Sequence, residues 1–352
     1  MKIGILTFHR AHNYGAVLQC YALQEVLKSI GYDVQVLDYR QPFIENLYST
    51  FDLHRFSGLL LHPRGIYHYC KSIPWRLKRK NIFNSFLKKH ILTTRPFRTD
   101  MPHDFDIYVI GSDQLWGLHC LGGVADDFYM GNFKHTPQSK VIGYAISTNL
   151  KSLKVLNNDN SLKDSVANFA KLSMREEFAA DYIGNEIGIK PSVCLDPTLL
   201  TDKTVWKPLI NDKWKDERYI LMYEVRCLKD NPNMLQEKAE ELANKYNCKI
   251  IDLSNMTYSV EDFVSLFKYA QYVVTTSFHA TVFSIIFDTP FYSVKLNDGH
   301  DGRYTNLLNA LGLETCCVEK DSICSPQEID FSSAKEKLDL LRGSSFEFLS
   351  EL

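Results

Sequence analysis

One histidine stands between small hydroxyl side chains and a long apolar run. In the stretch TTSFHATVFSIIFDTPF, residues 275–291, His279 follows Ser277 and comes just after the apolar segment YVV. An imidazole exchanges a proton near neutral pH, so it can serve as a general acid or base. A histidine in an apolar setting is more often a hydrogen-bonded core residue, and both interpretations stay open at this stage.

A dense polar cluster ends a second apolar run. In YVIGSDQLW, residues 108–116, Ser112, Asp113 and Gln114 follow directly after residues typical of a strand. A carboxylate in this position could act on a substrate, and it could also cap the N-terminus of a following helix. We favour a catalytic Asp113 with Ser112 and Gln114 contacting substrate, because a carboxylate, an amide and an indole follow one another.

The first loop of the chain offers an anion site. His12, Asn13, Tyr14 and Gly15 lie between an apolar strand and the start of a helix. Free backbone N–H groups and the helix dipole suit a phosphate or a carboxylate there, and Gly15 allows close approach. The loop is not a GxGxxG dinucleotide signature, so a turn or capping role is equally compatible with it.

Three cations complete the set of candidate binding residues. Arg175, in SMREEF, can hold a phosphate or carboxylate with two donors, although Arg before two Glu is also an ordinary helix start. Lys295 and Arg303 lie on the Gly- and Asp-rich segment KLNDGHDGR, which could equally be a turn. No cluster has metal-ligand spacing, so we expect no metal ion.

The elements that must position these residues alternate between strand and helix. KIGILTF, AVLQCYALQEVLKSIG and YDVQVLDY form a βαβ pattern, and DIYVIGS, KVIGYAIS and LSMREEFAADYIG continue it. A second alternation begins at RYILMYEV. We therefore expect an α/β protein with two Rossmann-like domains facing a cleft: residues 1–205, residues 206–325 and a helical tail, 326–352. Ligands bind at strand ends, so His279 should face that cleft.

Composition limits the class of protein. With 352 residues, 45% apolar and 23% charged, the chain is a folded globular protein large enough for two domains. The net charge of −2 argues against a surface built for nucleic acid. Nine scattered cysteines suit reduced thiols, and no apolar stretch is long enough for a signal peptide or a membrane span. These features predict a cytoplasmic location.

A basic insertion interrupts the pattern at residues 53–99. It contains no Asp or Glu, and its many Lys and Arg residues alternate with aromatic ones such as Tyr67 and Trp75. It is either a solvated helical excursion or a surface that docks on anionic lipid headgroups or a lipid-linked acceptor. The second interpretation predicts peripheral contact with the inner surface of the cytoplasmic membrane.

Five stretches in this order resemble the polysaccharide pyruvyl transferase family: NYGAVLQCYALQ, IGSDQLW, SMREE, SFHATVFSIIFDTPF and RYTNLLNALGL. The resemblance covers roughly residues 2–313 and implies an architecture similar to GT-B glycosyltransferases. It implies that phosphoenolpyruvate gives its pyruvyl unit to two hydroxyls of a sugar in a cell-surface polysaccharide precursor, as a cyclic ketal, with release of phosphate. The donor is a substrate, so no cofactor is expected.

The chemistry implied by the resemblance can be matched to the residues. Arg175, the loop of residues 12–15 and Arg303 would hold the charges of phosphoenolpyruvate, and His279 would protonate its methylene carbon. Some members of the family carry Arg where this chain has Ser277, so Lys295 or Arg303 would have to compensate. Two alternatives remain, a GT-B glycosyltransferase that uses a nucleotide sugar and a non-catalytic glycan-binding subunit.

Overall fold

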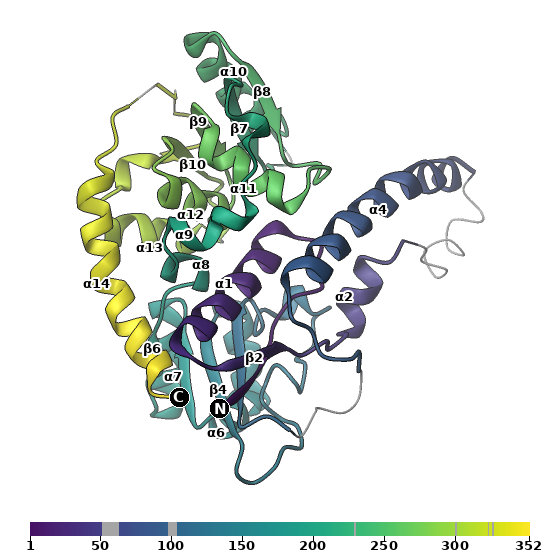
Figure 1. Ribbon diagram of the computed structural model, residues 1–352, viewed down its shortest axis with the longest axis vertical. Helices are drawn as coiled ribbons and strands as arrows, with labels where there is room; N and C mark the ends of the chain where they lie inside the picture. The colour runs from purple at the N-terminus through teal and green to yellow at the C-terminus, as the bar shows by residue number, and fades with distance from the viewer. Residues whose placement is uncertain (51–62, 98–103, 229, 300, 323, 326) are drawn as a thin grey trace. The chain divides into compact units, whose positions relative to one another are not determined.

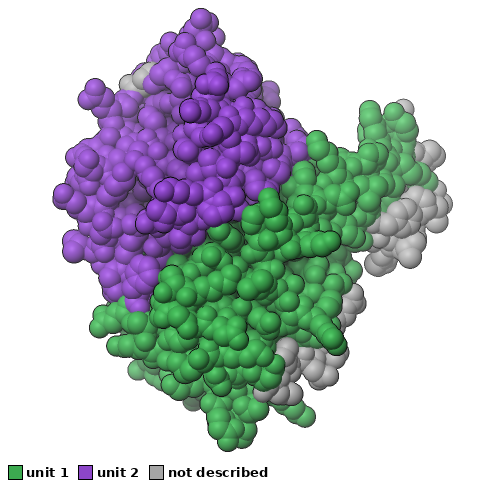
Figure 2. Space-filling view, in the orientation of Figure 1, with its two compact units in different colours: residues 1–197, 347–352 green, residues 198–346 purple. Residues whose placement is uncertain are grey.

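The computed structural model describes residues 1–50, 63–97, 104–228, 230–299, 301–322, 324–325 and 327–352. The chain divides into two compact units. Unit 1 comprises Met1–Pro197 and Glu347–Leu352, and unit 2 comprises Thr198–Phe346 (Figure 2).

Unit 1 is built on a six-stranded parallel sheet with the order β2-β1-β3-β4-β5-β6. Its strands are β1 (Lys2–Leu6), β2 (Asp33–Val36), β3 (Ile107–Asp113), β4 (Lys140–Ile146), β5 (Lys171–Met174) and β6 (Ser192–Val193). Its helices are α1 (Tyr14–Ile30), α2 (Pro42–Leu47), α4 (Pro63–His90), α5 (Leu150–Asn158), α6 (Ser161–Asn168) and α7 (Glu177–Ile187) (Figure 1). Buried positions run almost without interruption along β3 and β4, as expected of strands covered on both faces.

Unit 2 is built on a five-stranded parallel sheet with the order β11-β10-β9-β7-β8. Its strands are β7 (Tyr219–Tyr223), β8 (Lys249–Asp252), β9 (Tyr272–Thr275), β10 (Phe291–Lys295) and β11 (Cys317–Glu319). The helices are α8 (Pro197–Leu200), α9 (Lys203–Trp206), α10 (Met234–Tyr246), α11 (Val260–Tyr269), α12 (Phe278–Phe287), α13 (Gly302–Leu311) and α14 (Phe331–Ser350). Two parallel sheets with connecting helices confirm the α/β fold with two Rossmann-like domains.

The helix ends follow local chemistry. The Asn13 side chain accepts a hydrogen bond from the Ala16 N–H and so caps α1, and Gly31, at φ 104°, ends the same helix in the left-handed region. In unit 2 the Ser277 hydroxyl caps α12 by accepting from the Ala280 N–H. These caps fix where α1 and α12 start relative to the strands before them.

The division into units differs from the sequence-based boundaries. Unit 2 begins at Thr198 rather than at residue 206, and this segment contacts helices of unit 2: the Trp206 ring packs against Phe283 of α12, and Arg342 of α14 donates to the Leu199 carbonyl. The segment 326–352, predicted as a C-terminal helical tail, contains helix α14, whose residues up to Phe346 belong to unit 2. The last six residues, from Glu347, return to unit 1. Of the basic insertion, residues 53–62, 98 and 99 lie outside the described residues.

Candidate functional site

Polar side chains follow every strand of the unit 1 sheet at the edge where the strands end, which we call its carboxyl edge. The residues are Thr7 and His9 after β1, Asp38 after β2, Asp113 at the end of β3, Ser147 after β4, Arg175 and Glu176 after β5, and Asp196 after β6. Because the strands are parallel, these residues share one edge. The strand order reverses between β1 and β3, which is where α/β sheets of this kind bind ligands.

A buried hydrogen-bond network joins the strand ends at the place where the strand order reverses. The Thr7 hydroxyl donates to the Ser112 carbonyl at 2.9 Å, and the Gln19 amide donates to the Thr7 hydroxyl at 2.8 Å. The Ser112 hydroxyl donates to the Ala145 carbonyl at 3.1 Å and lies 3.5 Å from an Asp196 carboxylate oxygen. Ser112 is fully buried. It therefore ties strand ends together beneath the surface of the carboxyl edge.

Asp113 ends β3 in an unusual backbone conformation. Its φ is 83°, in the left-handed region, and Gly111 two residues earlier has φ 134°. The next helical residues begin only at Leu118, so the alternative in which Asp113 caps a following helix does not hold. Its carboxylate accepts from the Gln114 N–H at 2.8 Å and is 13% exposed. The left-handed turn thus leaves the carboxylate partly open to solvent at the strand end.

Arg175 lies inside a group of three carboxylates. Its guanidinium donates to Asp196 at 2.6 Å and to Glu176 at 3.3 Å, and Asp113 is 4.0 Å away. The side chain is only 5% exposed. Burial alone would lower the pKa of Arg175, but the attraction of these carboxylates raises it, so the side chain remains charged. We call this group of one guanidinium and three carboxyl side chains the Arg175 cluster.

Glu176 links the Arg175 cluster to the end of β4. Its carboxylate accepts a short hydrogen bond, 2.6 Å, from the Ser147 hydroxyl. The Ser147 N–H in turn donates to the Asp113 carbonyl at 2.9 Å. The ends of β3, β4, β5 and the segment after β6 are therefore held in one connected polar network.

A second ionic group occupies the ends of β1 and β2. The Asp38 carboxylate accepts from His9 Nε2 at 3.0 Å and from the Arg10 guanidinium, whose Nη2 lies at 2.7 Å. Burial would raise the pKa of Asp38, but the hydrogen bonds from His9 and Arg10 hold that pKa well below its usual range. Asp38, Glu176 and Asp196 were not singled out from the sequence. The only signal was an Asp directly after an apolar run, in VQVLD and in VCLD.

The loop of residues 12–15 combines structural roles with positive charge. Asn13 caps α1, and Tyr14 and Gly15 are buried. The His12 ring stacks on Phe83 of α4 with 5.4 Å between ring centroids. Burial, together with the charges of Arg79, Lys80 and Arg10, lowers the pKa of His12 to about 4. The imidazole is therefore neutral at pH 7, and the surroundings of this loop are electropositive.

Gln114 and Trp116 have hydrogen-bond partners within unit 1. The Gln114 amide oxygen accepts from the Cys120 thiol at 3.2 Å, and the Trp116 indole donates to the Tyr129 carbonyl at 3.0 Å. Trp116 is fully buried, so its ring belongs to the core of unit 1. Gln114 stands next to Asp113 and shares its place at the carboxyl edge.

In unit 2 the hydroxyl residues before His279 fix the start of α12. The Thr275 hydroxyl donates to the Tyr223 carbonyl at 2.6 Å, and Thr276 accepts from the backbone N–H of Val225 at 3.1 Å. Ser277 provides the N-cap of α12. His279, which is buried, therefore lies in the first turn of α12, directly beyond the carboxyl end of β9.

Arg226, which was not singled out from the sequence, joins two loops at the carboxyl edge of unit 2. Its backbone N–H donates to the Thr276 hydroxyl at 3.3 Å, and its guanidinium pairs with Asp298 and, at 3.0 Å, with Asp301. Asp301 also accepts from the N–H of Asn297 at 2.7 Å and from the hydroxyl of Tyr304. Arg226 thus clamps the loops after β7 and β10, on either side of the start of α12.

Lys295 and Arg303 occupy different places in unit 2. Lys295 ends β10 and pairs with Glu319 of the edge strand β11 at 2.9 Å, on the surface. Arg303 is partly buried in the first turn of α13, directly after the loop that Arg226 clamps. Arg303 is therefore the better placed of the two cations to serve the strand-end residues of unit 2.

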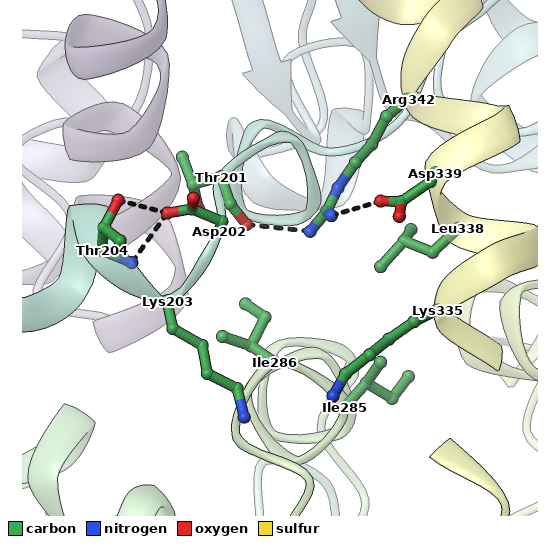
Figure 3. Close-up of a pocket in the computed structure, with 10 residues that line it drawn as sticks. All are labelled: Thr201, Asp202, Lys203, Thr204, Ile285, Ile286, Lys335, Leu338, Asp339 and Arg342. Carbon is green, nitrogen blue, oxygen red and sulfur yellow. Dashed lines mark hydrogen bonds and ion pairs between the residues drawn. The ribbon is translucent and has the colours of Figure 1, made fainter. Parts of the chain in front are cut away.

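A cavity of about 350 Å³ lies elsewhere in unit 2 (Figure 3). Ile285, Ile286 and Leu338 supply apolar lining, and the Lys203 and Lys335 amino groups both reach Asp288, at 2.5 and 2.7 Å. Asp288 stands at the C-terminal end of α12, whereas His279 lies in its first turn. The cavity is therefore separate from the strand-end residues around His279.

Two parallel sheets with connecting helices and polar residues at the strand ends define an α/β protein with two Rossmann-like units. The chain belongs to the polysaccharide pyruvyl transferase family, whose model matches residues 13–298. That range contains Asp113, Arg175 and His279. No curated protein sequence matches the chain.

Solved structures resemble the chain at low identity. S. aureus MnaA with UDP is 14% identical over 100% of this chain and 94% of that chain, with a TM-score of 0.48. The UDP-GlcNAc 2-epimerase of Methanocaldococcus jannaschii is 13% identical over 97% and 92%, with a TM-score of 0.47. The Streptomyces sp. SF2575 glycosyltransferase SsfS6 is 11% identical over 98% and 95%, with a TM-score of 0.40. At these values nothing about activity follows.

Two features are absent from the described residues. Within the described part of the chain, His, Cys, Asp and Glu side chains do not gather in groups of three or more suited to a metal ion. Among the same residues, no helix is both long and apolar enough to cross a bilayer.

Proposed function

We propose that the protein transfers the pyruvyl unit of phosphoenolpyruvate to two hydroxyls of a sugar, forming a cyclic ketal and releasing phosphate. The sugar belongs to a precursor of a cell-surface polysaccharide. The match to the polysaccharide pyruvyl transferase family carries the proposal, because it spans the strand-end residues of both units. Phosphoenolpyruvate is consumed as a substrate, and no cofactor takes part.

The reaction needs a proton donor for the enol carbon. Protonation of C3 by His279 turns the methylene into a methyl group and makes C2 electrophilic towards a sugar hydroxyl. The hydroxyl proton passes to a base, for which Asp113 is our candidate, and a second hydroxyl then displaces phosphate from C2. Of the two hydroxyl protons, one replaces the proton that His279 gave to C3 and the other leaves with phosphate. Atoms and charge therefore balance.

The Arg175 cluster and the loop of residues 12–15 have surroundings that support different roles. In the Arg175 cluster the partly exposed Asp113 carboxylate can accept hydrogen bonds from sugar hydroxyls, so we assign the cluster to the acceptor. The electropositive loop of residues 12–15 suits the phosphate or carboxylate of the donor, as does Arg303. Ser277 replaces the Arg of some family members, and its hydroxyl caps α12, so in our proposal it positions His279.

Donor binding is the first test. Phosphoenolpyruvate should raise the melting temperature of the purified protein, because a ligand that binds only the folded state stabilises it. A panel of nucleotide sugars serves as the comparison. A response to nucleotide sugars alone would overturn the proposal in favour of glycosyl transfer. Silence towards both would favour a non-catalytic glycan-binding subunit.

Turnover is the second test. Protein, phosphoenolpyruvate and a panel of sugar acceptors are incubated, released phosphate is measured, and the acceptor is examined by mass spectrometry for the addition of pyruvate with loss of water. His279→Gln and Asp113→Asn should each lower the rate about 100-fold or more while leaving phosphoenolpyruvate binding largely intact. His68→Gln, at an exposed histidine on α4, is the matched control and should behave as wild type.

A further inference from the structure

Helix α4 is strongly basic and only partly used by the fold. Its 28 residues, Pro63–His90, contain no Asp or Glu, and Lys88 and Lys89 fall in the last turn. In unit 1, α4 extends away from the sheet at its N-terminal end (Figures 1 and 2). A long basic helix with an exposed face is suited to a partner of negative charge.

One face of α4 is firmly packed on unit 1. Tyr69, Phe83, Phe86 and Leu87 are buried along it. The Phe83 ring lies 5.3 Å from the Tyr14 ring, and the Phe86 ring lies 6.1 Å from Tyr21, both on α1. The helix is therefore held in a fixed orientation, with its opposite face turned outward.

The outward face combines lysines with large apolar side chains. Tyr67, Lys71, Trp75 and Lys78 follow one another at spacings of three or four residues, which places them on one side of a helix. Tyr67 is 62% exposed and Trp75 is 39% exposed, and the neighbouring Leu77 is also exposed. The Lys71 amino group lies 5.9 Å from the centre of the Tyr67 ring. We call these five side chains the α4 outer face.

We propose that the α4 outer face docks the protein on a membrane surface rich in anionic phospholipid. Lysines on such a face attract anionic headgroups, and Tyr and Trp side chains favour the boundary between headgroups and acyl chains. The exposed Leu77 and Trp75 set this face apart from a purely electrostatic nucleic-acid surface. The proposal rests on α4 alone and is independent of the reaction proposed above.

The binding test uses vesicles. Full-length protein is sedimented with vesicles of phosphatidylcholine alone and with vesicles that also contain phosphatidylglycerol, and only the second set should carry it down. Each lysine near such a surface is worth about fivefold in affinity, so the double variant Lys71→Glu/Lys78→Glu should lose about 25-fold or more. Added salt should weaken binding of the wild type, because it screens exposed charges.

A matched double variant controls for net charge. Lys154→Glu/Lys163→Glu makes the same charge change at exposed positions of α5 and α6, on the same unit, and should bind as wild type. Circular dichroism and an unchanged melting temperature show that each variant is folded. Equal losses in both double variants would mean that net charge alone governs binding, and would overturn the proposal.

Tryptophan fluorescence reports whether the α4 outer face enters the membrane interface. Of the four tryptophans, Trp116 and Trp206 are buried and Trp214 is partly buried in unit 2, so Trp75 should dominate a blue shift of fluorescence on adding anionic vesicles, and Trp75→Phe should remove most of the shift. An RNA oligonucleotide is the competing polyanion. Binding to RNA without binding to vesicles would overturn the proposal in favour of a nucleic-acid surface, and binding to neither would overturn it outright.

Discussion

At the scale of single residues, the most informative property of the Arg175 cluster is that one buried guanidinium lies among three carboxyl side chains. The sequence alone presents Arg175 as a cation for an anionic donor, whereas the structure surrounds it with Asp113, Glu176 and Asp196. Removing one member of a buried ion group leaves charges without compensation, which costs more than the group contributes as a whole. Arg175 should therefore matter for folding as well as for ligand binding.

Replacement of Arg175 by Ala should destabilise unit 1 by about 3–5 kcal/mol, because buried carboxylates lose their counter-ion. Urea denaturation measures the change in the free energy of unfolding, and hydrogen exchange shows whether β4 and β5 lose protection. Arg175→Lys, which keeps the charge, should recover part of the loss. Lys190→Ala, which removes the exposed pair with Asp181, is the control and should leave the midpoint unchanged. A wild-type midpoint for Arg175→Ala would show that the cluster does not hold the strand ends together.

His12 predicts a specific dependence of stability on pH. Its pKa is lowered to about 4 in the folded protein by burial and by nearby Arg79, Lys80 and Arg10, against about 6.5 when unfolded. Between these two values the unfolded chain binds the extra proton, so stability rises with pH. The contribution of His12 is full above pH 6.5 and is lost as the pH falls towards 4. The stability lost through His12 between pH 6.5 and pH 4 is on the order of 3 kcal/mol.

His12→Gln tests this dependence, because the amide does not titrate in that range. The free energy of unfolding, measured between pH 4 and 7, should vary less steeply with pH in this variant than in the wild type. His68→Gln, at an exposed position of α4, should retain the wild-type slope. An unchanged slope in His12→Gln would show that the imidazole is not held neutral.

At the scale of elements, the end of β3 depends on a close backbone approach. A Cβ atom at Gly111 would lie 1.9 Å from the Tyr144 carbonyl oxygen of β4, and its φ of 134° is a conformation that other residues rarely adopt. The two strands pair there, so neither can move aside without loss of hydrogen bonds. Gly111 therefore lets β3 turn and present Asp113 at the carboxyl edge.

Gly111→Ala should destabilise unit 1 by roughly 3 kcal/mol or more, because both the contact and the backbone conformation are unfavourable. Gly123→Ala is a matched control, since Gly123 also has positive φ, 92°, but open space around its Cβ position. The control should lose only about 1 kcal/mol. Melting temperature and the yield of soluble protein measure the difference, and equal effects in the two variants would rule out the close approach as the cause.

The alternation of elements could be predicted because apolar periodicity is a local property of the chain. The short helices α5 and α6, of nine and eight residues, and the three-residue edge strand β11 were not predicted from these patterns. At the candidate site, Asp113, Arg175 and His279 were identifiable because each follows an apolar strand. Asp196, which pairs with Arg175, and Asp38, which pairs with His9 and Arg10, also follow apolar runs but were not singled out, because only the sheet order brings these side chains next to their partners.

At the scale of the whole molecule, the chain passes between the units twice. It leaves unit 1 after Pro197 and returns at Glu347, within α14. The returning residues are well packed, since Phe348 and Leu349 are buried. The Lys171 amino group donates to the Phe348 carbonyl at 3.2 Å and lies 4.4 Å above the Phe348 ring. The C-terminal end of α14 is therefore part of the unit 1 fold.

Phe348→Ala should destabilise unit 1 by about 3–5 kcal/mol, because it removes a buried ring that contacts Tyr144 of β4 at 5.9 Å between centroids. Each unit has its own sheet, so the loss should be local. Hydrogen exchange should accelerate in β4 and β5 and remain unchanged in β7 and β9. Leu340→Ala, at a position on the same helix that is 80% exposed, should change neither. Equal acceleration in both sheets would instead mean that the two units unfold as one.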